Sequence, residues 1–133
     1  MRPGMNFRPL LILLLLPALY AELPPSAYES MQAKAPEYLK VEILRVEVEP
    51  GESPTMQNIH VVALTAEVFR TASGLKPNEI LNILYTVTEH PPGWVGPGEV
   101  PIPKEKERSV AYLVKTEAGD FAPAAGRMSF TNF

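Results

Sequence analysis

The chain has 133 residues and a formal net charge of −3, with 46% hydrophobic and 20% charged residues. This balance suits one folded domain and excludes a large multidomain enzyme and a polytopic membrane protein. The absence of cysteine excludes disulfide frameworks, cysteine-based zinc sites and a cysteine nucleophile. The acidic balance argues against nucleic acid as a partner, because binding to nucleic acid requires a basic surface.

Residues 1–21 are predicted to be a signal peptide. Two arginines and no acidic residue precede an unbroken aliphatic run at residues 10–16, and small residues follow at plausible cleavage positions. Cleavage is expected after Ala21, with Ala18 as the second candidate site. The apolar run is short for a membrane span, so an uncleaved anchor is the alternative rather than the expectation. We therefore expect a periplasmic or secreted protein with no stable membrane span after cleavage.

Residues 22–37 are expected to form a leader that contains a short helix. Ser26 and Glu29 have the spacing of a capping box at the start of this helix. Pro36 is expected to end it, because proline interrupts the helical hydrogen-bond pattern. The folded domain is expected to occupy residues 38–133.

Alternating apolar and polar residues predict that this domain is built from strands. The expected strands are residues 38–48, 59–70, 79–88, 109–116 and 127–130. Leu44 and Arg45 shift the alternation by one residue, which predicts a β-bulge or a sharp bend in the first strand. The segment 90–103 is rich in proline and glycine, so it is expected to form neither a helix nor an inner strand.

Five strands with this spacing fit an all-β fold. The best match is a five-stranded OB-like Greek-key barrel, which is compatible with a long bent early strand and a variable connection between the third and fourth strands. An immunoglobulin-like sandwich is the alternative, although it prefers about seven strands. The sequence therefore predicts an OB-like barrel with a short N-terminal helix.

The order of four segments also carries a resemblance to a known family. They are a long strand ending at residues 66–70, the connection 73–78, the strand 80–85 and, after a glycine-rich crossing, the strand 110–113. In this order the stretch 61–130 resembles the netrin-like module shared with tissue inhibitors of metalloproteinases, which has an OB-fold. The resemblance implies the fold but not inhibition, because no residue here matches the N-terminal cysteine through which those inhibitors meet the catalytic zinc. The chain also looks like small exported bacterial proteins, for which the resemblance implies no activity.

The sequence contains no recognised catalytic motif, phosphate-binding loop or diagnostic metal-ligand spacing. Its two histidines, His60 and His90, are expected to be surface residues, with a small metal-assisted hydrolase that uses both as the alternative. Glu47 and Glu49 share one strand face, which we expect to be solvated together with Glu42. We therefore predict no catalytic residues, no cofactor and no metal.

The candidate binding residues lie in two segments. Trp94, the only tryptophan, precedes Val95 in a proline-stiffened loop, and an aromatic side chain with little entropy to lose is a good contact residue. Phe121 and Arg127 mark a second candidate surface, where small residues allow a close approach of the backbone. The alternatives are that Trp94 caps the open end of the barrel and that Phe121 packs in the core.

These observations predict an exported, non-catalytic binding or protein-interaction module. Its partner is expected to be a protein or a small ligand in the cell envelope. A structural component of an envelope assembly is the alternative function, besides the metal-assisted hydrolase.

Overall fold

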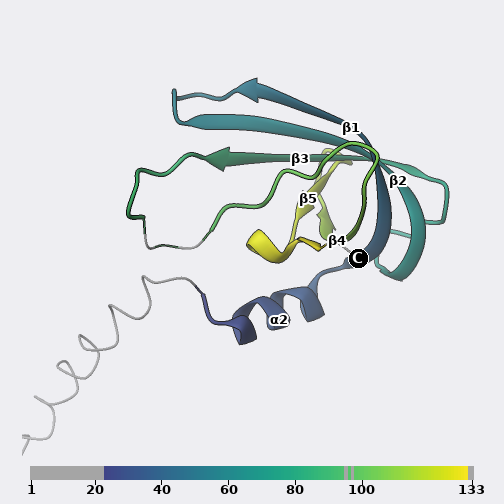
Figure 1. Ribbon diagram of the computed structural model, residues 1–133. Coiled ribbons are helices and arrows are strands. Elements are labelled where there is room, and N and C mark those ends of the chain that lie inside the picture. Colours follow the sequence, from purple (N-terminus) through teal and green to yellow (C-terminus); the bar gives the residue numbers. More distant parts are fainter. Residues whose placement is uncertain (1–22, 95, 97, 132–133) are drawn as a thin grey trace, which may run out of the picture.

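The structure is a computed structural model that describes residues 23–94, 96 and 98–131. The predicted signal segment, residues 1–21, lies outside these residues, and so does Val95. The described chain forms a β-barrel with one short helix on its N-terminal side (Figure 1). In chain order the elements are the helix α2 (Pro25–Lys34), the strands β1 (Glu37–Pro50), β2 (Met56–Thr71), β3 (Ile80–Thr88), β4 (Arg108–Lys115) and β5 (Phe121–Pro123), the 3-10 turn η2 (Gly126–Met128) and the strand β6 (Phe130–Thr131).

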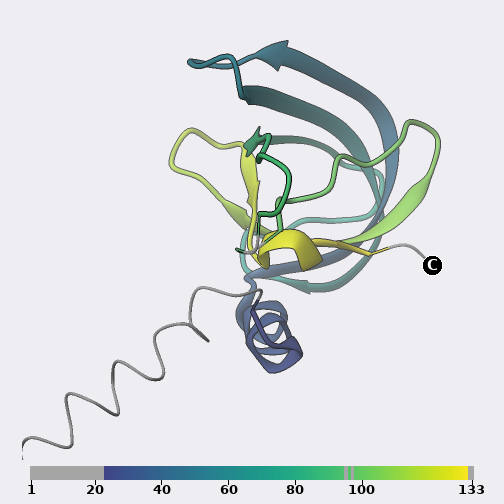
Figure 2. The same ribbon diagram turned by 60° about the vertical axis from the view of Figure 1, so that its left-hand side comes forward.

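Strands β1 to β5 close the barrel. The hydrogen-bonded order is β1-β2-β3-β5-β4, and β4 also pairs with β1, which joins the two ends of the sheet. The pairing of β3 with β5 is parallel, and the other pairings of the barrel are antiparallel. Figure 2 shows these strands wrapped around a common interior. The predicted five-stranded OB-like Greek-key barrel is therefore confirmed, rather than the sandwich.

The two longest strands, β1 and β2, form a hairpin that extends beyond β4. β1 pairs with β2 along its whole length, whereas it pairs with β4 only from Glu37 to Glu42. The pairing with β2 shifts between Ile43 and Arg45, so the predicted irregularity at Leu44 and Arg45 is confirmed as a bulge. Past the bulge, β1 has β2 on one side and no strand on the other among the described residues.

The core fills the barrel with apolar side chains from every strand of the sheet. On β2, Ile59, Val61 and Ala63 are buried and point inward, whereas the intervening Val62 and Leu64 lie half-buried on the outer face. The core cluster comprises Leu39, Val41, Ile43, Ile59, Val61, Ala63, Leu81, Ile83, Val87, Ala111, Leu113, Phe121 and Phe130. This alternation leaves the outer faces of β1, β2 and β3 available for other contacts.

Helix α2 lies outside the barrel and contacts η2 (Figure 1). The predicted capping box of Ser26 and Glu29 is wrong, because the helix starts at Pro25 and no side chain caps its first turn. Proline suits this position, since its fixed φ fits a helix and its missing N–H would have no helical acceptor there. At the other end, the Arg70 guanidinium donates to the backbone oxygen of Ala35 at 2.8 Å. Among the described residues, no helix is long and apolar enough to span a membrane.

The strand that closes the barrel lies earlier than the sequence predicts. We expected a last strand at residues 127–130, but β5 is the strand that pairs with both β3 and β4. Residues 126–128 form η2 instead. Of the expected strand, only Phe130 pairs with β4, as part of β6. Pro123, which signals a turn in the sequence, is the last residue of β5.

The connection between β3 and β4 runs across the barrel without a helix, as predicted for its described residues. Val100 packs against the core, and the Tyr85 hydroxyl donates to the backbone oxygen of Pro101 at 2.8 Å. Burial raises the pKa of the Tyr85 hydroxyl above its usual range. The connection is therefore anchored to the barrel by an apolar contact and a hydrogen bond.

Candidate functional site

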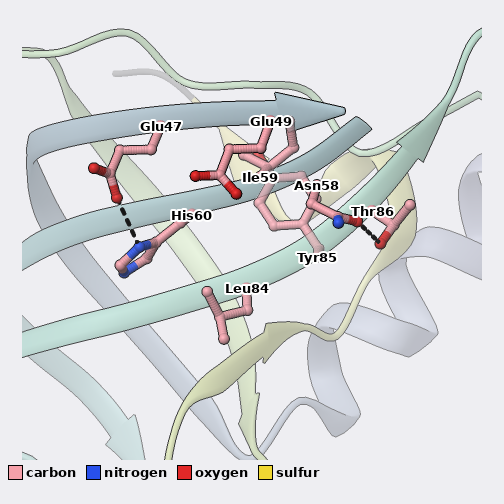
Figure 3. Close-up of a pocket in the computed structure, with 8 residues that line it drawn as sticks. All are labelled: Glu47, Glu49, Asn58, Ile59, His60, Leu84, Tyr85 and Thr86. Carbon is pink, nitrogen blue, oxygen red and sulfur yellow. Dashed lines mark hydrogen bonds and ion pairs between the residues drawn. The ribbon is translucent and has the colours of Figure 1, made fainter. Parts of the chain in front are cut away.

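A hollow of about 530 Å³ lies on the outer face of the sheet formed by β1, β2 and β3 (Figure 3). All of its lining residues come from these three strands: Glu47, Glu49, Asn58, Ile59, His60, Leu84, Tyr85 and Thr86. The strand register explains why they meet, because it places Glu47 opposite His60 and His60 opposite Leu84. The next row places Glu49 opposite Asn58. Six of the eight lining residues thus form two rows of cross-strand neighbours on the outer face, and the pair Ile59 and Tyr85 lies between these rows.

His60 occupies the middle of this surface and is held from both sides. Its Nδ1 atom lies 3.0 Å from a carboxylate oxygen of Glu47, and its Nε2 atom lies 2.8 Å from the side-chain oxygen of Asn82. The guanidinium of Arg45 is a weaker neighbour of Glu47, with 3.8 Å between nitrogen and oxygen. The His60 side chain remains 33% exposed. These contacts fix the ring while leaving part of it open to solvent.

The rest of the lining combines hydrogen-bond acceptors with the exposed apolar side chain of Leu84. Leu84 is 42% exposed and presents its apolar side chain to solvent. The Thr86 hydroxyl donates to the side-chain oxygen of Asn58 at 3.1 Å, and the carboxylate of Glu49 is directed toward the same side as that of Glu47 (Figure 3). The hollow therefore offers a ligand an exposed apolar side chain beside negative charge.

The side chains of the hollow do not pair a hydroxyl with the imidazole of His60. A hydroxyl nucleophile needs an adjacent base, but the hydroxyl of Thr86 is engaged with Asn58 rather than with His60. His90, the other histidine of the hydrolase alternative, contacts Glu99 with 3.0 Å between Nε2 and Oε2, in the connection after β3. In the described part of the chain, no three histidine, aspartate or glutamate side chains are grouped closely enough to hold a metal ion.

Trp94 lies in the same connection, outside the core cluster. Its side chain is 51% exposed and its ring stacks on His90, with 4.1 Å between the ring centroids. The position agrees with a surface residue rather than with a cap packed into the barrel. The neighbouring candidate Val95 lies outside the described residues.

The second predicted surface is divided between core and exterior. Phe121 is only 5% exposed and belongs to the core cluster, which is the alternative that the sequence left open for it. Arg127 is exposed on η2, where its guanidinium lies 5.0 Å from the centre of the Tyr28 ring. The structure therefore does not bring Phe121 and Arg127 together into one contact surface.

Sequence reasoning missed the hollow because it assigned the glutamates of β1 to a plain solvated face. Alternation alone places Glu47 and Glu49 on one face. The rows they form with Asn58 and His60 depend on the register across β2, which the sequence does not reveal. Comparison of the chain with protein-family models, with curated proteins and with solved structures finds no match.

Proposed function

We propose that this chain is an exported, non-catalytic module that binds a protein partner through the outer face of β1, β2 and β3. The observation that carries the proposal is the position of the hollow. OB barrels bind their ligands on the outer face around their second and third strands, and the hollow lies on that face. This is an argument from the fold, so the identity of the partner depends on the residues of the site.

Those residues favour a protein as the partner. Protein contact surfaces combine an apolar centre with a polar rim, and here the exposed Leu84 lies beside Glu47, Glu49 and His60. The exposed Trp94, in the connection after β3, adds an aromatic contact residue. Nucleic acid is disfavoured, since two carboxylates on the binding face repel phosphate.

Export and family relationship belong to the same proposal. The arginines and the aliphatic run of residues 1–21 support export. The closed OB-like strand order supports the resemblance to the netrin-like module at the level of the fold.

The proposal can be tested by site-directed photo-crosslinking in the native host. A photoreactive amino acid replaces Leu84 on the hollow in one full-length variant and Val114 on β4 in another. These are matched positions, because the two side chains are 42% and 36% exposed and only Leu84 lines the hollow. Cross-linked species from the envelope and secreted fractions are then identified by mass spectrometry, together with the N-terminus of the bait.

The proposal predicts a processed N-terminus and one reproducible protein adduct from position 84 that position 114 does not form. Equal adducts from both positions would contradict a specific face. No protein adduct from position 84 would contradict a protein-binding function. A bait with an intact N-terminus would show that the module stays tethered to the membrane.

A further inference from the structure

The edge of β1 beyond its bulge has backbone groups that the rest of the described chain does not use. Beyond the paired stretch of β1 and β4, the chain before β4 continues to protect this edge for a few residues. The Ile43 N–H donates to the backbone oxygen of Glu107 at 2.8 Å, and the Lys106 N–H donates to the backbone oxygen of Ile43 at 2.7 Å. The carboxylate of Glu105 then accepts from the Val46 N–H at 3.0 Å. Protection of the edge ends there.

The direction of the next backbone groups follows from the alternation of an antiparallel pair. The Val46 N–H points away from β2, since it reaches Glu105. The Gly51 N–H points toward β2, since it donates to the backbone oxygen of Met56 at 2.8 Å. Val48 is two residues after Val46 and three before Gly51. Both its N–H and its C=O therefore point away from β2.

Within residues 23–94, 96 and 98–131, no strand pairs with the side of β1 that faces away from β2 after Glu42, and no hydrogen bond reaches the backbone on that side after Val46. Val48 is 46% exposed, and the two residues that flank it on each side are exposed or half-buried. An unpaired strand edge of this kind is a template for another strand. The Val46 N–H is taken by Glu105, so the accessible backbone groups run from the carbonyl of Val46 to Pro50, where proline supplies no further N–H.

A second copy of this chain is poorly suited to this edge. Two β1 edges paired antiparallel around Val48 would place the glutamates of one copy directly opposite those of the other. Like charges directly opposite each other across a sheet are destabilising. Cationic side chains in those two positions would instead be attracted to Glu47 and Glu49. The charge pattern thus selects a partner strand that differs from β1 itself.

We infer that the β1 edge from Val46 to Pro50 binds an extended segment of another protein by β-strand addition. The segment has an apolar residue opposite Val48 and lysine or arginine on either side, opposite Glu47 and Glu49. Main-chain hydrogen bonds to Val48 provide affinity, and the two charges provide specificity. The inference concerns the edge of the sheet and does not require the hollow to be occupied.

The probe for this edge is an acetylated and amidated heptapeptide of alternating lysine and valine. Binding to the full-length protein is measured by isothermal titration calorimetry at physiological salt, and the exchange rate of the Val48 amide hydrogen is followed by NMR. The control peptides are an alternating glutamate and valine heptapeptide and the lysine peptide methylated on the backbone nitrogens that would face Val48.

We expect the lysine peptide to bind and to slow exchange of the Val48 amide, whereas the glutamate and methylated peptides bind at least about tenfold more weakly. Glu49→Lys should weaken binding of the lysine peptide about fivefold. Glu49 suits this test better than Glu47, because it lacks the contact with His60. The matched control is Glu117→Lys in the exposed turn after β4, which makes the same change in net charge and should alter binding less than about twofold.

Three results would overturn the inference. They are equal binding of the methylated peptide, equal effects of Glu49→Lys and Glu117→Lys, and unchanged exchange of the Val48 amide at saturating peptide. Because Glu49 also lines the hollow, the methylated peptide and the exchange of the Val48 amide are the results that report on the edge alone, whereas occupation of the hollow is tested by adducts from position 84. Failure of strand addition and failure of the proposed binding function are therefore distinguishable.

Discussion

The indole of Trp94 lies nearly parallel to the imidazole of His90, with 4.1 Å between the ring centroids and 5° between the ring planes. Glu99 holds the imidazole, and its other carboxylate oxygen accepts from the Thr88 N–H at 2.7 Å. A Cβ atom added at Gly96 would lie only 2.2 Å from the indole. The exposed indole is thus fixed by the imidazole on one ring face and by a close approach of the backbone at Gly96.

This arrangement predicts that Trp94→Ala weakens partner binding without unfolding the protein. Loss of a pre-positioned aromatic contact should reduce the affinity by about 2 kcal/mol or more, whereas the melting temperature should change by less than about 2 °C. The affinity is measured with the cross-linked partner and the melting temperature by circular dichroism. A large fall in the melting temperature with unchanged affinity would assign Trp94 to the fold instead.

Gly96→Ala tests the orientation of the indole separately from its presence. The added methyl group must displace Trp94, so we expect weaker binding together with a changed near-ultraviolet circular dichroism signal. The melting temperature should remain close to that of the wild type, because the indole lies outside the core. Wild-type affinity in a variant whose indole signal has changed would show that its orientation is unimportant.

Thr65→Val should leave the protein as stable as the wild type or make it more stable. The Thr65 hydroxyl is buried and has no hydrogen-bond partner among the described residues. Valine has nearly the same shape and removes the unsatisfied group, which relieves a burial penalty of roughly 1 kcal/mol. Urea unfolding measures the difference. Destabilisation by more than about 1 kcal/mol would indicate that the hydroxyl has a partner in solution.

Tyr85 should make the stability depend on alkaline pH. Burial raises the pKa of its hydroxyl in the folded state, whereas an unfolded tyrosine ionises near its ordinary value of about 10. The resulting contribution to stability is complete below pH 10 and is lost as the pH rises toward the folded-state value, because the unfolded chain releases the proton first.

Tyr85→Phe is therefore expected to be about 1 kcal/mol less stable at pH 7, since it lacks the hydrogen bond to Pro101. Its unfolding free energy should then fall less steeply between pH 9.5 and about 11 than that of the wild type. Urea titrations across this range measure both slopes. Tyr112, whose pKa is raised first by burial and then by the neighbouring Tyr38, is retained in both proteins and cancels in the comparison. Identical slopes would contradict the burial of Tyr85.

The sequence predicted the barrel well because strand alternation and the bulge at Leu44 and Arg45 are local signals. It misplaced the closing strand because the three residues of β5 are too few to show alternation. It missed the start of α2 because Pro25, rather than Ser26, begins the helix. The hollow and the free edge of β1 could not be predicted, since both depend on which residues face each other across strands.

The most direct test of the proposed function compares two matched substitutions on different faces of the barrel. Leu84→Asp adds a charge to the hollow, and Val114→Asp adds the same charge at a similarly exposed position on β4. The affinity of each full-length variant for the cross-linked partner is measured by isothermal titration calorimetry, after circular dichroism has shown that both are folded. We expect Leu84→Asp to bind at least about thirtyfold more weakly and Val114→Asp to bind like the wild type. Wild-type affinity in Leu84→Asp would contradict binding through the outer face of β1, β2 and β3.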